Sequence, residues 1–429
     1  MIAALAILGC NDPIAKADIG HDDTGGHDSG DLDTGGGGVD TACLPDLAYE
    51  VPQPSSTATW AGPCEGFGRL LTMSEFSDGV RIANGSVTCD ASLPDAGAVT
   101  VLTDSLDEVF TVEGEYEGHF LGSQLALAPA TEAVVEERLA AAWGPLGGTP
   151  LGEGGINLYD ASSGELRASI YEPGVWLGKD LAFTGDVLLS GAPMAGDRDG
   201  AVYVWAWDGA TERSGADALA VHHGGGVFGE LGTQVLDAGD IDGDGLPEAV
   251  FDSDAGGLLV AGDDVAMDEG YLNGVRLGGF ALGRAIAPIG DMDGDGLDEF
   301  AMGNLSSPYS PSGHVEIRGM GVDPIAYLAD DRGLAVDIGR YVGDLGEIAE
   351  PGRGAFAVLV YPEEWWSDSA EVWVVEGPLC GVVSFESVGT LYAELTDADY
   401  EHQFASAGNA VGVVGNVDGV NGTIRLLYW

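Results

Sequence analysis

Short alternating runs of apolar and polar residues, each preceded by glycine or another small residue, recur along most of the chain. Alternation with a period of two is typical of a β-strand that buries one face. Seven such runs begin between residues 97 and 422, so their six intervals average about 54 residues. They read GAVTVL at 97, GGINLYD at 154, GAVYVWAW at 200, GGLLVAG at 256, GHVEIRG at 313, AEVWVVEG at 370 and GTIRLLYW at 422.

A second recurring element opens each unit. It reads GFGRLL at 66, FLGSQLAL at 120, WLGKDLAF at 176, ELGTQVL at 230, ALGRAIA at 281, RGLAVDIG at 332 and, in blurred form, HQFASAGNAVGVVG at 402. Each unit is therefore a few short strands with Gly-rich turns, which cannot bury an apolar face alone. Radial stacking of four-stranded blades buries such faces and leaves only short, protected edges. The sequence predicts an all-β fold, a seven-bladed β-propeller of about 54-residue repeats over residues 43–429.

The last unit suggests how the ring closes. GTIRLLYW matches the third strand of the other units, so one outer strand is missing from the seventh blade. The chain ahead of Gly66 can supply it, either as DLAYEV at 46 or as STATW at 56. An open ring with a simple linker is the alternative.

Two acidic segments with the same spacing lie between predicted strands, GDIDGDGLPEA from Gly239 to Ala249 and GDMDGDGLDEF from Gly290 to Phe300. Glycines such as Gly294 and Gly296 let the backbone curl, so alternate side chains can converge on one point. Carboxylates this close repel one another by roughly 1 kcal/mol per pair even at a water-like dielectric, and a cation removes that cost. An all-oxygen site with irregular geometry suits Ca²⁺ better than Mg²⁺. A solvated acidic loop is the alternative.

These segments are not EF-hands. The EF-hand loop needs a bidentate glutamate at position 12 and a helix on each side. Position 12 is Phe251 in one copy and Met302 in the other, and both loops run into short apolar segments that predict strands.

In their order along the chain, these pieces resemble the FG-GAP repeats of the integrin-alpha N-terminal β-propeller. That family's repeat opens with Phe-Gly, continues into an Asp-x-Asp/Asn-x-Asp-Gly-x-x-Asp loop, and follows with a Gly-Ala-Pro-like turn and a GxVYVF-like strand. This chain has GFG at Gly66, DIDGDGLPE, DMDGDGLDE, and LLSGAPMAGDRDGAVYVW from Leu188 to Trp205. The resemblance covers roughly residues 60–429.

The resemblance implies a Ca²⁺ ion in each loop, in the first hairpin of a blade. The carboxylate ligands would be Asp240, Asp242, Asp244 and Glu248 in one loop and Asp291, Asp293, Asp295 and Glu299 in the other, with backbone carbonyls from Leu246 and Leu297. Glutamate stands where the family has aspartate at position 9, so the loop must accommodate one more methylene. The other units lack the motif, and Asp197 and Asp199 in GDRDG are only two acids on a turn. We therefore expect two calcium sites.

Composition constrains the setting. The chain has 15 basic and 71 acidic residues, a net charge of −56, and Lys16 and Lys179 are its only lysines. Such a surface repels nucleic acid and anionic lipid headgroups and favours divalent cations and cationic partners. We expect no nucleic-acid partner.

The N-terminus differs from the rest of the chain. MIAALAILGC, residues 1–10, resembles the end of a bacterial lipoprotein signal, in which cleavage precedes a lipidated cysteine, here Cys10. It is too short for a complete signal peptide. Residues 11–42 are rich in Gly, Asp and Thr and predict a flexible tether. We expect an exported protein on the cell envelope, attached to a membrane only through a lipid anchor.

Apart from Cys10, the cysteines are Cys43, Cys64, Cys89 and Cys380, an even number that fits an oxidising compartment. Three pairings are possible. Cys64 with Cys89 would lie within the first unit, and Cys43 with Cys380 would attach the entry segment to a later blade. We favour this combination because it reinforces ring closure.

No catalytic motif is present: the sequence lacks Gly-x-Ser-x-Gly, a phosphate-binding loop, Ser-x-x-Lys and His-Glu-x-x-His. His222 and His223 precede GGG and predict a solvated surface loop. We expect a non-catalytic, monomeric binding or adhesion module for a protein or glycan. The resemblance implies that partners bind the face opposite the calcium loops. Two alternatives remain, a hydrolase or lyase with carboxylates in the central channel, and a structural envelope component.

Overall fold

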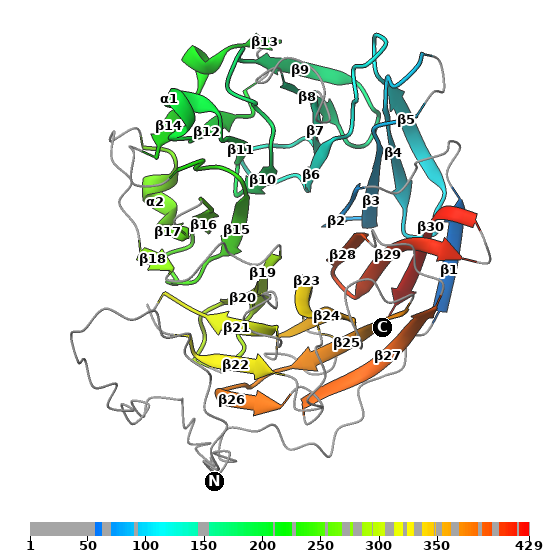
Figure 1. The fold of residues 1–429 in the computed structure, drawn as a ribbon, viewed down its shortest axis with the longest axis vertical. Coiled ribbons are helices and arrows are strands. Elements are labelled where there is room, and N and C mark those ends of the chain that lie inside the picture. The colour runs from blue at the N-terminus through cyan, green and yellow to red at the C-terminus, as the bar shows by residue number, and fades with distance from the viewer. Residues whose placement is uncertain are drawn as a thin grey trace, which may run out of the picture.

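Seven small β-sheets form a ring in the computed structural model (Figure 1). The structure describes residues 56–428 apart from short gaps, of which the longest are 62–69, 145–153, 268–274, 278–284, 305–312, 330–336, 362–368 and 397–402. Each sheet takes consecutive strands of the chain, as the period of the sequence predicts. The fold is a seven-bladed β-propeller.

The first four blades contain residues 70–277. Blade 1 has β2 (Leu70–Phe76), β3 (Gly79–Ser86), β4 (Ala98–Thr103) and β5 (Glu108–Glu113). Blade 2 has β6 (Gln124–Ala128), β7 (Arg138–Trp143), β8 (Gly155–Asp160) and β9 (Leu166–Tyr171). Blade 3 has β10 (Leu181–Thr184), β11 (Val187–Ala192), β12 (Ala201–Ala206) and β14 (Ala220–His223). Blade 4 has β15 (Val235–Gly239), β16 (Glu248–Phe251), β17 (Gly257–Val260) and β18 (Val275–Leu277). Among the described residues, short helical turns lie between strands at α1 (Ala195–Arg198), η2 (Gly215–Asp217) and α2 (Gly262–Val265).

The last three blades complete the ring. Blade 5 has β19 (Ile286–Gly290), β20 (Glu299–Asn304), β21 (His314–Arg318) and β22 (Ala326–Ala329). Blade 6 has β23 (Asp337–Gly346), β24 (Ala355–Tyr361), β25 (Ser369–Glu376) and β27 (Gly389–Thr396). Blade 7 has β28 (Gln403–Ala407), β29 (Ala410–Val417), β30 (Val420–Tyr428) and β1 (Ser56–Ala61).

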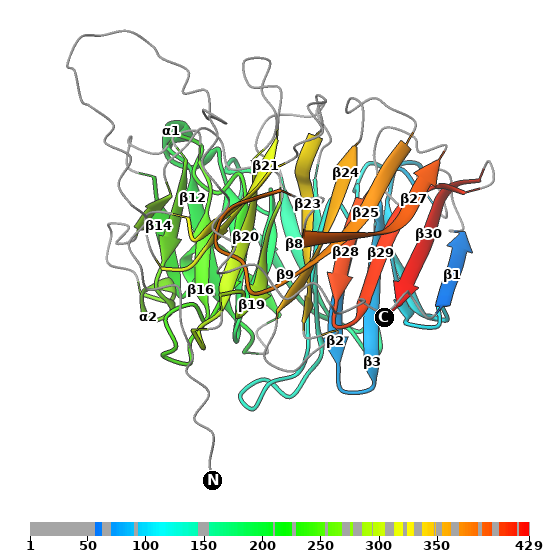
Figure 2. The same ribbon diagram turned by 90° about the horizontal axis from the view of Figure 1, so that it is seen from below.

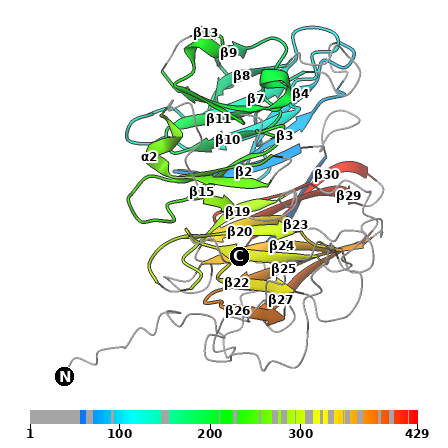
Figure 3. The ribbon, with the colours of Figure 1, turned by 60° about the vertical axis from the view of Figure 1, so that its left-hand side comes forward.

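The first strand of every blade lies next to the central axis (Figure 1), and each of these inner strands contacts the inner strand of the next blade. Seen from the side, the strands run roughly along the axis (Figure 2). Neighbouring sheets lie face to face (Figure 3), and the apolar faces of adjacent blades form the core. In that core Trp205, Phe251, Phe300 and Phe356 are fully buried.

The ring closes through the N-terminal segment. β1 pairs antiparallel with β30, from Ser56 opposite Tyr428 to Ala61 opposite Thr423. Trp60 packs against the core cluster that blades 1 and 7 share. STATW therefore supplies the missing outer strand, whereas DLAYEV lies outside the described residues.

Two blades carry a fifth strand that the repeat pattern does not predict. β13 (Glu212–Arg213) leaves blade 3 between its third and fourth strands and pairs in parallel with β9 of blade 2. β26 (Gly381–Ser384) leaves blade 6 at the same point and pairs in parallel with β22 of blade 5. Each extra strand covers an edge and links two neighbouring blades.

Glycines explain why each unit opens with the same motif. Gly232, in ELGTQVL, has a φ of +88° and lies against Gly191 of blade 3. A methyl group on Gly191 would overlap the Gly232 carbonyl oxygen, and equivalent contacts join Gly85 to Gly122 and Gly303 to Gly339. Only glycine permits backbones of adjacent blades to approach this closely.

We expect Gly232→Ala to destabilise the ring by roughly 3–5 kcal/mol, because it combines backbone strain with a steric overlap. Its Cβ would lie 2.5 Å from the Ala201 oxygen and 2.9 Å from the Gly191 Cα. Gly174→Ala is the control, since Gly174 has a φ of +83° but no atom within 4 Å of the added methyl. Urea unfolding of both variants separates the free-energy cost of backbone strain, which both share, from that of the steric overlap, which only Gly232→Ala has. Equal losses would mean that the contact between blades contributes nothing.

Within the described residues, no helix has the length and apolar character needed to cross a membrane.

Candidate metal centres

The two acidic loops occupy the same place in neighbouring blades. Loop 1, residues 240–247, joins β15 to β16, and loop 2, residues 291–298, joins β19 to β20. Each is the first hairpin of its blade, as the resemblance implies. Both hairpins have the same register, with Gly239 opposite Glu248 and Gly290 opposite Glu299 after a shift in pairing. The two glycines have φ values of +79° and +67°, a conformation that turns the chain into the loop.

Loop 1 brings three of its predicted ligands together. Oxygens of Asp240, Asp242 and Glu248 all lie within 4.8 Å of one another. Asp240 also holds the turn, because its Oδ1 accepts a hydrogen bond from Gly243 N (2.9 Å) and its Oδ2 one from Gly245 N (3.0 Å). Asp244 lies outside the cluster, and its Oδ1 accepts from Leu246 N at 2.8 Å.

Loop 2 assembles a slightly different set. Oxygens of Asp291, Asp293 and Asp295 lie within 4.8 Å of one another. Glu299 is outside this cluster, and its Oε2 accepts hydrogen bonds from Met292 N (2.6 Å) and Asp293 N (3.2 Å). Glu248 makes similar bonds, from Ile241 N (2.8 Å) and Gly262 N (3.0 Å), but remains in the cluster of loop 1. The side chains of Leu246 and Leu297 are exposed, and a role for their carbonyls stays a prediction.

Burial makes the two glutamates electrostatically unusual. Glu299 is 2% exposed, and its pKa is raised to about 8. Burial is the main cause, the Met292 N–H opposes the shift, and the charges of Asp293, Asp295 and Asp291 add to it. Glu248 is fully buried, and burial together with Asp242 and Asp240 raises its pKa as well. In the described part of the chain, no basic side chain forms an ion pair with Asp240, Asp242 or Glu248. An all-oxygen, strongly negative donor set of this kind fits Ca²⁺.

No protein-family model matches this sequence, and no curated protein aligns with it. The likeness to FG-GAP repeats therefore rests on the sequence motifs alone. The structure shows the seven-bladed ring that this likeness implies.

The loops touch each other, which their spacing did not predict. A methyl group on Gly243 would lie 2.7 Å from Leu297 Cδ2, and one on Gly239 would lie 3.7 Å from Asp298 Oδ2. Asp298 thus lies between the two loops, where burial, followed by the charges of Asp240 and Asp291, raises its pKa. The equivalent position in loop 1 is Pro247. The two copies therefore share no acid at this position, and comparing them could not mark Asp298 as a site residue.

Other sequence predictions fare differently. His222 is not in a solvated loop: it belongs to β14, is buried, and its Nε2 lies 2.8 Å from the Val265 oxygen. The prediction was wrong because the alternating strand continues through it, and only His223 is exposed. Cys10 and the segments 1–10 and 11–42 lie outside the described residues.

Two cysteines are resolved in their oxidised state. Cys89 and Cys380 are both disulfide-bonded, whereas Cys43 and Cys64 lie outside the described residues. Cys89 follows β3 of blade 1, and Cys380 precedes β26 on blade 5, with blades 6 and 7 between them. The pairings Cys64–Cys89 and Cys43–Cys380 stay predictions.

The half-buried carboxylate of Asp180, at the junction of blades 3 and 4, predicts a pH-dependent stability. Asp180 Oδ2 accepts a hydrogen bond from Val235 N (2.9 Å), and burial raises the pKa of Asp180 from 3.8 to about 6. The fold therefore favours the neutral form, a contribution that is complete below pH 3.8 and is lost as the pH rises through 6.

Replacing Asp180 by asparagine keeps the acceptor and removes the charge. We expect Asp180→Asn to match the wild type near pH 4 and to exceed its free energy of unfolding by roughly 1–3 kcal/mol near pH 7.5. Denaturant unfolding at both pH values tests this, with Asp197→Asn on the surface as the control. A variant less stable than the wild type at both pH values would contradict it.

Proposed function

We propose that this protein is a calcium-binding, non-catalytic β-propeller that acts as a binding or adhesion module on the bacterial cell envelope. One observation carries the proposal: two hairpins at the same place in adjacent blades each gather three carboxylates within 4.8 Å. Bringing these charges together is costly without a cation, and the buried glutamates add to that cost. Calcium would lock both hairpins and fix the position of blades 4 and 5 in the ring.

The binding role draws on the fold and the motifs. The ring offers two faces, with the acidic hairpins on one and the connections from second to third strands on the other. In the integrin-like proteins partners bind opposite the calcium loops, so we place the protein or glycan partner on that face. The sequence ILGC, which ends at Cys10, supports export and a lipid anchor. The catalytic alternative requires a further carboxylate cluster. Among the described residues, only the two loops bring three or more metal-binding side chains within 4.8 Å.

Isothermal titration with Ca²⁺ tests the proposal on the full chain. We expect two ions per chain, weaker binding of Mg²⁺, one ion in Asp242→Asn or Asp293→Asn, and none when both are combined. Asp197→Asn, on an acidic turn outside the loops, should still bind two. Absence of calcium binding, or binding that survives the double substitution, would overturn it.

A further inference from the structure

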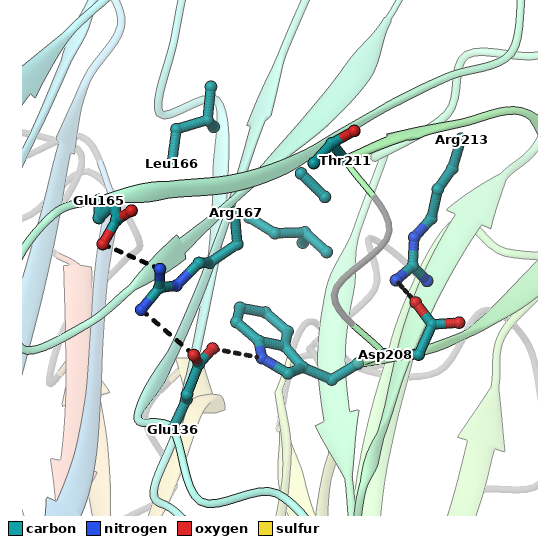
Figure 4. Close-up of a pocket in the computed structure, with 10 residues that line it drawn as sticks. Glu136, Glu165, Leu166, Arg167, Asp208, Thr211 and Arg213 are labelled. Carbon is teal, nitrogen blue, oxygen red and sulfur yellow. Dashed lines mark hydrogen bonds and ion pairs between the residues drawn. The ribbon is translucent and has the colours of Figure 1, made fainter.

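A cavity of about 280 Å³ lies at the outer rim of the ring, at the junction of blades 2 and 3 (Figure 4). β8 and β9 of blade 2 contribute Leu158, Leu166, Arg167 and Ala168, and the segment that follows β12 of blade 3 contributes Trp207, Asp208 and Thr211. β13 fixes this segment in place, because Glu212 and Arg213 pair with Ser169 and Ile170 of β9. The cavity is therefore a product of the extra strand, and it lies on other blades than the calcium loops.

The polar side chains of the cavity hold one another in position. Glu136 links two of them, because its Oε2 accepts a hydrogen bond from Trp207 Nε1 (3.0 Å) and its Oε1 lies 3.2 Å from Arg167 Nη2 (Figure 4). Arg167 Nη1 also pairs with Glu165 at 2.9 Å. On the other side Arg213, whose side chain is 3% exposed, pairs with Asp208. The indole of Trp207 is fixed further by the edge of Phe183, with ring centroids 6.2 Å apart.

These pairings decide the charge of the ligand. Both guanidinium groups are already neutralised by carboxylates, and three acids, Glu136, Glu165 and Asp208, line the cavity against two arginines. An anion would add to this excess and to the net charge of −56. A wholly apolar ligand would leave the charged groups desolvated and without water. A cationic ligand would have to compete with Arg167 and Arg213, to which the three acids are already bonded. We infer that the ligand is neutral and rich in hydroxyl groups.

A sugar ring has the matching shape. A pyranose presents a flat C–H face and a rim of hydroxyls, and the cavity offers the indole of Trp207 and the apolar floor of Leu158 and Ala168 beside paired donors and acceptors. Its volume, about 280 Å³, is just below the usual range of sites for drug-sized molecules. That volume suits one sugar ring, and the fixed side chains reduce the ordering cost of binding.

We propose that this cavity binds one neutral pyranose of a glycan, with the sugar face against Trp207 and its hydroxyls bonded to Glu136, Arg167 and Asp208. The inference rests on the proposed role as a binding module and names a glycan as its ligand. It adds a second binding surface at the rim, separate from the face on which we place the principal partner.

The test uses the calcium-loaded full chain and four neutral probes, the methyl glycosides of glucose, galactose, mannose and N-acetylglucosamine, with N-acetylneuraminic acid as an anionic probe. Saturation-transfer NMR and calorimetry measure binding. We expect at least one neutral glycoside to bind with a dissociation constant of roughly 0.1–10 mM, as a ligand of this size allows. We expect Trp207→Ala to weaken binding at least about tenfold. N-acetylneuraminic acid should not bind.

Two further variants keep the test sharp. Trp373→Ala is the matched control, because the Trp373 indole also donates to a glutamate, Glu371 Oε2 at 2.8 Å, but in blade 6; it should leave sugar binding unchanged. Thr211→Trp places a bulky side chain at the exposed edge of the cavity and should block binding even if Trp207→Ala fails to fold. Binding of no neutral glycoside, binding of the anionic probe alone, or binding that survives Thr211→Trp would overturn the proposal. Calcium calorimetry on the same samples shows separately whether the calcium sites are intact.

Discussion

Removal of calcium is expected to lower the melting temperature of the propeller by roughly 5–10 °C. An ion at about 100 times its dissociation constant stabilises the fold by roughly 2.7 kcal/mol per site if the unfolded chain does not bind it. Two sites thus contribute about 5 kcal/mol, and each kcal/mol corresponds to about 1–2 °C in a domain of this length. Differential scanning calorimetry with Ca²⁺ and with a chelator measures the difference.

The variants make this prediction specific to the loops. Asp242→Ala combined with Asp293→Ala removes one clustered carboxylate from each loop and should abolish the response to calcium. Asp197→Ala combined with Asp199→Ala removes two acids from another Gly-rich turn and should leave the response intact. The same melting temperature with calcium and with chelator would contradict the structural role of the ions.

Loss of the closing strand should have an effect of similar size. Deletion of residues 1–61 removes β1 and its six residue pairs with β30. Deletion of residues 1–55 is the matched control, because it also removes Cys43 but leaves β1 in place. At about 0.5–1 kcal/mol for each lost backbone hydrogen bond, plus the burial of Trp60, we expect a loss of roughly 3–6 kcal/mol.

The deletion also exposes β30 as an unprotected edge, so the shorter chain should self-associate. Chemical unfolding and light scattering of the two truncated chains measure both effects. Equal stability and equal solubility would show that the ring does not depend on β1.

The fold follows from features that a single sequence displays. The spacing of the Gly-opened strands gave the number of blades, because each unit repeats the same local chemistry. Contacts such as Gly191 with Gly232 explain why the opening motif recurs: it places glycine where backbones of adjacent blades meet. β13 and β26 could not be predicted, because their pairing partners lie in the preceding blade and their sequences carry no alternation of sufficient length.

The sequence predicted which two loops form the candidate metal sites, but not which side chains cluster in each loop. The spacing correctly predicted that Asp242 and Asp293 belong to the two clusters, but it could not show that Asp244 and Glu299 would lie outside them. Asp298 was missed because its importance arises from the neighbouring loop, and Trp207 and Arg167 were missed because the cavity is assembled by two blades. The repeated motifs predict the conformation of a hairpin within one blade, whereas Asp298 and the cavity depend on contacts between neighbouring blades.

The central claim is that each acidic loop holds one calcium ion, and anomalous X-ray scattering from crystals grown with CaCl₂ tests it most directly. The account predicts two anomalous peaks, one among Asp240, Asp242 and Glu248 and one among Asp291, Asp293 and Asp295. Loops without peaks, in crystals where calcium saturates the solution, would contradict it.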